Sequence, residues 1–125
     1  MQEQDKAILL IDDEIIVLKS AKRILEKKGY TVLTAENADV GTELLKKHTD
    51  GIGVILLDLT MPGIDAEEAF DRLIEIDPAA KVLLFSGMLH NDQCDRLFAK
   101  GAVGYIHKPF EIEELTSKID PYLSR

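Results

Sequence analysis

The chain is poor in residue types that define several protein classes. It has one cysteine, Cys94, and no tryptophan among its 125 residues. A single cysteine excludes an intramolecular disulfide and leaves no second thiol for a zinc site, so we expect a free thiol in a reducing compartment. No apolar stretch approaches the ~20 residues of a membrane-spanning helix. The first residues lack the basic and apolar regions of a signal peptide, and we therefore expect a cytoplasmic protein without a membrane partner.

Positive charge is also scarce. Lysine and arginine together number 15 against 23 aspartates and glutamates, which gives a formal net charge of −8. Because no basic run interrupts this excess, we expect no direct binding to nucleic acid. The surplus carboxylate is the kind of charge that a cation neutralises. With 46% hydrophobic and 30% charged residues, the chain has the composition of a globular domain. We expect one domain over residues 1–125, with no output module attached.

Short apolar runs alternate five times with helical patterns along the chain. Four runs cover residues 8–11, 54–57, 82–85 and 104–107, and a more polar one covers residues 30–35. Runs of this length, bounded by turn residues, are typical of strands buried in a parallel sheet. Five strand–helix units favour an open doubly wound sheet over an eight-stranded barrel. The predicted fold is α/β, with the polar strand at an edge.

Helix ends and helix faces can be predicted as well. Asn37 is a candidate N-cap, and Gly29 lies where a helix C′ residue would. Helical spacing places Ile24 and Val40 on the apolar faces of their helices. Pro121 is expected to distort the last turn of the final helix.

Four of the predicted strands lead into a polar residue of the kind that phosphate and metal chemistry uses. These residues are Asp12 and Asp13 after the first strand, then Asp58, Ser86 and Lys108 after the three other apolar runs. Because the carboxyl ends of parallel strands lie at one edge of a sheet, three carboxylates, a hydroxyl and an ammonium group should converge. Each residue alone has an ordinary explanation, such as an N-cap or a turn. Their joint occurrence at successive strand ends is specific.

Such a cluster of carboxylates favours cation binding. Carboxylates ~5 Å apart repel one another by about 3 kcal/mol per pair at an effective dielectric constant of roughly 20. Oxygen ligands without histidine or thiol favour Mg²⁺, with Mn²⁺ as the alternative cation. Beside such a cation, Lys108 can contact a phosphate group and Ser86 can donate a hydrogen bond to it. A carboxylate in this setting is a competent nucleophile for phosphoryl transfer.

Taken in series, the motifs resemble those of the receiver domain of two-component response regulators, over essentially the whole chain. The matching segments are Asp12-Asp13-Glu14, residues 57–63, Ser86-Gly87 and Lys108-Pro109-Phe110. The resemblance implies a flavodoxin-like sheet of five strands in the order 2-1-3-4-5, with five helices. It also implies a signalling switch that catalyses only its own phosphorylation and dephosphorylation, and not a metabolic enzyme.

The resemblance assigns roles to individual residues of this chain. Asp58 matches the position that accepts a phosphoryl group from a histidine kinase or a phosphotransfer protein. Lys108 matches the lysine that contacts the phosphoryl group. Asp13, Asp58 and the backbone carbonyl of Thr60 match the magnesium ligands, and Asp12 matches the acid that acts through a coordinated water.

Further positions match the switch of this family. Ser86 takes the place of the switch hydroxyl and Tyr105 that of the switch aromatic, although the sequence alone favours an ordinary half-buried strand tyrosine at position 105. The resemblance implies that phosphorylation remodels the face formed by the fourth helix, the fifth strand and the fifth helix, which is also a candidate homodimer interface. The peptide bond between Lys108 and Pro109 is expected to be cis. Ala66 departs from the family, because many receivers have a glycine there.

Three alternative functions use a similar fold or similar chemistry. A flavin- or nucleotide-binding module needs a glycine-rich phosphate loop after the first strand, where Asp12-Asp13-Glu14 would repel phosphate. A haloacid-dehalogenase-type phosphohydrolase carries its nucleophile there in an Asp-x-Asp pattern, which this segment does not match. A degenerate receiver that only docks a partner is the third alternative, although every chemical position is filled here.

Overall fold

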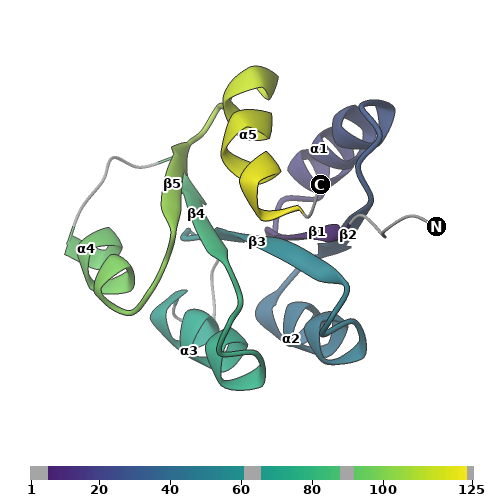
Figure 1. Ribbon diagram of the computed structural model, residues 1–125. Helices are drawn as coiled ribbons and strands as arrows, with labels where there is room; N and C mark the ends of the chain where they lie inside the picture. The colour runs from purple at the N-terminus through teal and green to yellow at the C-terminus, as the bar shows by residue number, and fades with distance from the viewer. Residues whose placement is uncertain (1–5, 61–65, 88–91, 124–125) are drawn as a thin grey trace.

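The computed structural model of the protein describes residues 6–60, 66–87 and 92–123, built around one central sheet. The sheet has five parallel strands in the order β2-β1-β3-β4-β5 (Figure 1). They are β1 (Ala7–Ile11), β2 (Val32–Ala35), β3 (Ile52–Asp58), β4 (Val82–Ser86) and β5 (Gly104–His107). This is the flavodoxin-like order that the sequence analysis predicts, and the most polar strand, β2, lies at an edge.

Helices cover both faces of the sheet. On one face lie α1 (Ile15–Lys27) and α5 (Ile112–Ile119), and on the other lie α2 (Ala38–Lys47), α3 (Ala66–Ile76) and α4 (Asp92–Ala99) (Figure 1). A short 3₁₀ helix, η1 (Asp120–Tyr122), follows α5 and contains Pro121, which confirms the distortion predicted there. Each strand is followed by a helix that returns the chain to the end of the sheet where the next parallel strand begins.

Successive residues of the central strands face opposite helical layers, so the sheet separates two hydrophobic cores. In β1, Leu9 and Ile11 belong to the core beneath α2, α3 and α4, whereas Ile8 and Leu10 belong to the core beneath α1 and α5. All four side chains are fully buried. Burial on both faces explains why these strands are continuous apolar runs in the sequence. The packed sheet fixes the backbone at the strand ends, where the polar residues lie.

Local sequence signals account for the helix ends but less well for the helix faces. Asn37 Oδ1 accepts a hydrogen bond from the Val40 N–H at 2.8 Å, which confirms the predicted N-cap of α2. Gly29, which follows α1, has a φ of +97°, a conformation that favours glycine. Ile24 and Val40, which helical spacing places on apolar faces, are nevertheless 44% and 42% exposed. Both lie at the margin of a buried helix face, beside hollows in the surface.

Three further sequence features concern the scarce residues and the loops. Cys94 is buried in α4 and is not part of a disulfide. Across residues 6–60, 66–87 and 92–123, no helix is long and apolar enough to cross a bilayer. Residues 61–63, which complete the motif after Asp58, lie outside the described residues.

Candidate functional site

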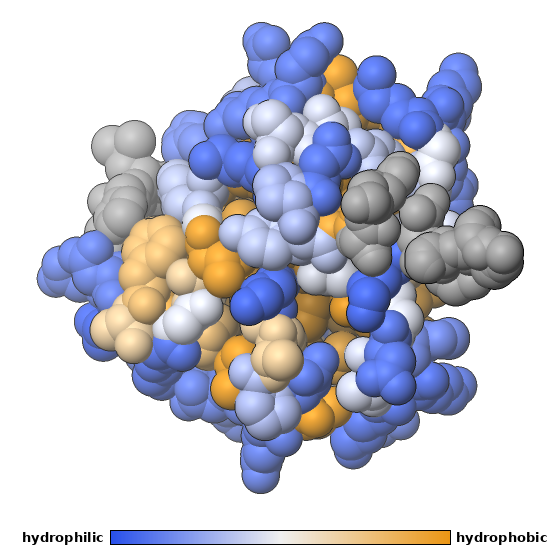
Figure 2. Space-filling view, in the orientation of Figure 1, coloured by the Kyte–Doolittle hydropathy of each residue, from blue (hydrophilic) through white to orange (hydrophobic). Residues whose placement is uncertain are grey.

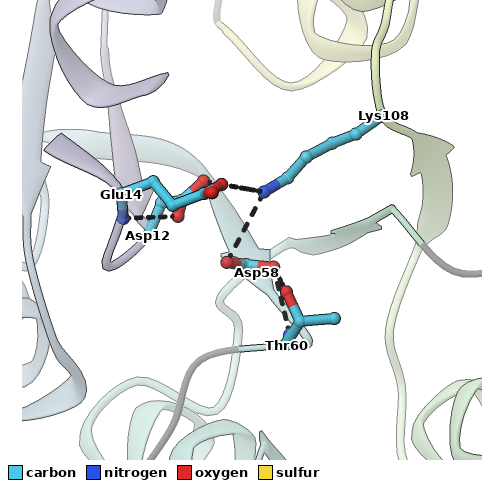
Figure 3. Close-up of polar contacts among 5 residues, drawn as sticks. All are labelled: Asp12, Glu14, Asp58, Thr60 and Lys108. Atoms are coloured by element: carbon cyan, nitrogen blue, oxygen red, sulfur yellow. Dashed lines mark hydrogen bonds and ion pairs between the residues drawn. The ribbon is translucent and has the colours of Figure 1, made fainter. Parts of the chain in front are cut away.

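Polar side chains from the ends of β1, β3 and β5 meet at the carboxyl edge of the sheet (Figure 3), and Ser86 ends β4 at the same edge. Asp12 follows β1, Asp58 ends β3, Ser86 ends β4 and Lys108 follows β5. The residues Asp12, Asp58 and Ser86 are each at most 2% exposed. One carboxylate oxygen from each of Asp12, Asp13 and Asp58 lies within 4.8 Å of the other two. The predicted convergence of three carboxylates with an ammonium group is therefore confirmed.

Asp12 is held by two hydrogen bonds. Its Oδ1 accepts from the Glu14 backbone N–H at 2.9 Å, and its Oδ2 accepts from the Lys108 ammonium group at 3.1 Å (Figure 3). Burial raises the pKa of Asp12 to about 6, and the neighbouring Asp58 carboxylate adds to this rise. The hydrogen bonds from Glu14 and Lys108 act in the opposite direction. The raised pKa reflects negative charge that is both crowded and shielded from water.

The two carboxylate oxygens of Asp58 have different surroundings. Oδ1 accepts hydrogen bonds from the Thr60 backbone N–H at 3.1 Å and from the Thr60 hydroxyl at 2.9 Å. Oδ2 has no hydrogen-bond partner among the described residues, although Lys108 Nζ lies 3.6 Å away as an ion pair. Buried polar atoms in native proteins are nearly always hydrogen-bonded. Asp58 Oδ2 is therefore the atom of this site that is best placed to take a further ligand.

Lys108 places a positive charge among these acids. Its Nζ lies 3.1 Å from Asp12 Oδ2, 3.3 Å from Glu14 Oε1 and 3.6 Å from Asp58 Oδ2. The same atom lies 5.0 Å from the ring centroid of Phe85, within reach of a cation–π contact. Burial lowers the pKa of Lys108, but the hydrogen bond to Asp12 and the charges of Asp58 and Asp12 outweigh it, so the pKa is raised. The lysine is therefore a permanent cation at neutral pH.

The aspartate cluster fits a hard divalent cation. The ligand atoms of Asp12, Asp13 and Asp58 are all carboxylate oxygens, the donor type that Mg²⁺ prefers. Asp13 is exposed, which suits a cation that keeps several of its waters. The buried Asp58 Oδ2 without a hydrogen-bond partner is a second observation that fits, because a cation would satisfy it. These residues could hold Mg²⁺.

The residues predicted for the switch lie on two neighbouring strands, Ser86 at the end of β4 and Tyr105 within β5. The Lys108 backbone N–H donates to the Ser86 carbonyl at 2.8 Å, so the two strands stay paired up to the site. The peptide bond between Lys108 and Pro109 is cis, the isomer that the resemblance implies. Tyr105 is half-buried against the core beneath α2, α3 and α4. Burial raises the pKa of Tyr105, and Cys94 adds to the shift.

Two contacts at the site were not predicted from the sequence. The motif assigns no role to Glu14, yet its carboxylate contacts Lys108. The Phe85 ring lies beside Lys108 and packs edge-on against Phe110, with the ring centroids 6.3 Å apart. The presence of a third acid directly after Asp12 and Asp13 was the sequence signal that could have indicated the contact between Glu14 and Lys108. No pattern in the sequence distinguishes Phe85 from an ordinary buried strand residue.

Comparisons with known proteins agree with this geometry. The family model of the response regulator receiver domain matches residues 8–120. The chain belongs to this family. A curated relative, the chemotaxis protein CheY of Treponema pallidum, is 31% identical over 113 residues, which cover 90% of this chain and 78% of CheY. The protein is therefore a CheY-like receiver domain of two-component signalling, a system in which receiver domains interact with histidine kinases or phosphotransfer proteins.

Solved receiver structures share the fold. A response regulator receiver domain protein from Clostridium thermocellum has a TM-score of 0.87 and 28% identity, with 94% of this chain and 93% of that chain covered. A response regulator from Burkholderia pseudomallei has a TM-score of 0.81 and 26% identity, with 92% of this chain and 66% of that chain covered. The second structure contains a phosphorylated aspartic acid, a calcium ion and citrate.

Proposed function

We propose that this receiver domain accepts a phosphoryl group on Asp58, from a histidine kinase or a histidine phosphotransfer protein, in a reaction that requires Mg²⁺. One observation carries the proposal: Asp58 Oδ2 is buried, has no hydrogen-bond partner among the described residues and lies 3.6 Å from Lys108 Nζ. The phosphorylated aspartic acid in the Burkholderia pseudomallei relative supports the same chemistry.

Asp58 Oδ2 is the nucleophile in the proposed transfer. Thr60 fixes the carboxylate through two hydrogen bonds to Oδ1, which leaves Oδ2 available to the donor. An O–P bond forms at Oδ2 while the P–N bond of the donor phosphohistidine breaks, and the leaving imidazole takes up a proton. Apart from the bond that Asp58 forms, catalysis of such a step is mainly positioning and neutralisation of charge.

The surrounding residues take complementary parts in this proposal. Asp13, Asp58 and the backbone carbonyl of Thr60 would hold Mg²⁺ or Mn²⁺, and Asp12 would contribute through a water. When bound, the cation neutralises charge on the oxygens of the transferred group. Lys108, already among these acids, donates N–H groups to the phosphoryl oxygens on Asp58.

The proposal includes a switch that links the site to a surface. The Ser86 hydroxyl donates a hydrogen bond to the phosphoryl group. The Tyr105 side chain changes position when Ser86 does, so the face formed by α4, β5 and α5 is remodelled. In α4, which is described in full, the buried residues are Cys94 and Leu97 alone, so this helix is lightly anchored. Figure 2 shows apolar surface over α4 and β5, where Phe98 and Tyr105 are half-buried. This surface suits a protein partner, including a second copy of the domain.

The domain is, on this proposal, a switch that catalyses its own phosphorylation and dephosphorylation. A degenerate receiver that only docks a partner has no observation in its favour. The aspartates and the lysine on which the chemistry depends are present and close together.

Beryllofluoride, which mimics a phosphoryl group on an aspartate, tests the proposal. We expect the wild type to bind beryllofluoride with Mg²⁺ present and not in EDTA, as measured by fluorine NMR. Asp58→Asn should keep its circular dichroism spectrum and bind none. Asp50→Asn is the matched control, because Asp50 precedes β3 at the opposite edge of the sheet and should not affect binding. Binding by Asp58→Asn, or by the wild type in EDTA, would contradict the proposal.

A further inference from the structure

Glu14 occupies a helix-capping position without capping the helix. It is the N-cap residue of α1, with φ −90° and ψ 108°. Side chains at an N-cap usually accept a hydrogen bond from the first turn of the helix. The Glu14 side chain makes no such bond, and its Oε1 lies 3.3 Å from Lys108 Nζ (Figure 3). The Glu14 side chain therefore contacts Lys108 instead of capping α1.

The backbone of Glu14 determines where this carboxylate lies. Its N–H donates to Asp12 Oδ1 at 2.9 Å, and its carbonyl accepts from the Leu18 N–H at 3.1 Å. Both sides of the residue are thus anchored, one to the site and one to the first turn of α1. The side chain itself is 61% exposed, so its contact with Lys108 is partly screened by water.

The three carboxylates around the Lys108 ammonium group are not equivalent. Asp12 and Asp58 belong to the cluster that fits a divalent cation, and Glu14 does not. A cation bound there would repel the lysine and share the oxygens that now attract it. Glu14 would keep its charge and its contact. It is therefore the carboxylate that continues to hold Lys108 Nζ away from Asp58.

We propose that Glu14 is a positioning residue that restrains Lys108 and competes with a phosphoryl group on Asp58 for the N–H donors of that lysine. This inference rests on the proposed function and adds a regulator of the same site. Removal of the Glu14 charge then strengthens binding of a phosphoryl mimic, because Lys108 is released. The same change leaves Mg²⁺ affinity unchanged or lower, because a nearby negative charge is lost. A merely structural role would weaken both.

Glu14→Gln tests the proposal, because it keeps the length of the side chain and removes its charge. By calorimetric titration at saturating Mg²⁺, we expect beryllofluoride to bind about two- to fivefold more tightly, the scale of a partly exposed ion pair. Glu14→Asp keeps the charge but is one methylene shorter, so it should fall between wild type and Glu14→Gln. Glu36→Gln is the matched control, because Glu36 follows β2 at the same edge and is not among the groups that contact Lys108.

Beryllofluoride affinity in Glu14→Gln at or below that of the wild type, with Mg²⁺ binding intact, would overturn the proposal. A second readout needs no phosphoryl chemistry. The nitrogen NMR resonance of Lys108 Nζ in the metal-free protein should shift in Glu14→Gln and not in Glu36→Gln. A wild type that binds no beryllofluoride contradicts the proposed function, and with it the competition. An unshifted Lys108 resonance contradicts the role of Glu14 by itself.

Discussion

Lys108 Nζ lies 3.6 Å from Asp58 Oδ2, farther than it lies from Asp12 or Glu14. The lysine follows β5 and the aspartate ends β3, with β4 between them in the sheet. Their distance is therefore set by the packing of three strands and not by local sequence. In this position the lysine offsets the charge of Asp12 and is ready to meet a group added to Asp58.

Loss of the lysine should destabilise the metal-free protein. Lys108→Met keeps most of the apolar stem but leaves the buried carboxylates of Asp12 and Asp58 without their cation. We expect the free energy of unfolding in EDTA to fall by roughly 3 kcal/mol, the usual effect of breaking a buried ion pair. Mg²⁺ should restore much of it, because metal affinity is retained. Urea unfolding measures the free energy of unfolding in EDTA and in Mg²⁺. Lys47→Met is the control, because Lys47 is exposed on α2. Equal stability of wild type and Lys108→Met in EDTA would contradict this account.

Asp13 should matter for metal binding and little for stability. Because its side chain is exposed, Asp13→Asn should change the free energy of unfolding by about 0.5 kcal/mol or less in EDTA. Mg²⁺ affinity should fall about tenfold or more, equivalent to about 1.4 kcal/mol. Calorimetric titration with Mg²⁺ gives the affinity, and Asp50→Asn controls for the loss of one negative charge. An unchanged titration would remove Asp13 from the ligand set.

The raised pKa of Asp12 makes a contribution to stability that decreases as pH rises. This pKa is about 6 in the folded protein and 3.8 for the ordinary group. Between these values the folded protein binds a proton that the unfolded chain has lost, so the free energy of unfolding falls as pH increases. Asp12→Asn lacks this dependence. In EDTA, the stability of Asp12→Asn relative to wild type should therefore increase from about pH 4 to about pH 6. Urea unfolding across that window measures it, and a constant difference would contradict the assignment.

Two ion pairs on successive helical turns join α4 to α3. Arg96 Nε lies 2.8 Å from Glu67 Oε2, and Lys100 Nζ lies 3.1 Å from Asp71 Oδ1. Such exposed pairs contribute about 0.2–1 kcal/mol each, and they add to the burial of Cys94 and Leu97, the two buried residues of α4. We expect the double variant Arg96→Gln/Lys100→Gln to increase amide hydrogen exchange in α4 several-fold while global stability changes by roughly 1 kcal/mol.

Hydrogen exchange followed by mass spectrometry measures the mobility of α4. High salt should produce the same effect in the wild type, because it screens exposed charges. Lys46→Gln is the control, since its pair with Glu43 lies within α2. Unchanged exchange in α4 would show that the ion pairs do not hold this helix.

The apolar runs in the sequence predicted a doubly wound parallel sheet and the convergence of the site, whereas the strand order was predicted from the resemblance to receiver domains. Buried runs such as residues 8–11 identify central strands, and parallel strands bring their carboxyl ends together. Asp12, Asp58 and Lys108 are thus close in space although up to 96 positions separate them along the chain.

Individual side-chain contacts and the degree of burial could not be predicted from the sequence patterns. Glu14 and Lys108 are 94 positions apart, and their contact depends on two side-chain conformations that no motif encodes. The spacing of apolar residues predicted which side of each helix faces the core, but not how wide the buried face is. Ile24 and Val40 therefore fit the apolar pattern and are still exposed, because none of the described elements covers the margins of their helices.

Intact mass after incubation with Mg²⁺ and acetyl phosphate tests the central claim most directly, with wild type beside Asp58→Asn. We predict that the wild type gains one phosphoryl group that is lost on standing, that EDTA prevents the gain and that Asp58→Asn stays at its starting mass. A wild type that gains nothing, or an Asp58→Asn variant that gains the same group, would contradict the claim that Asp58 is the phosphoacceptor.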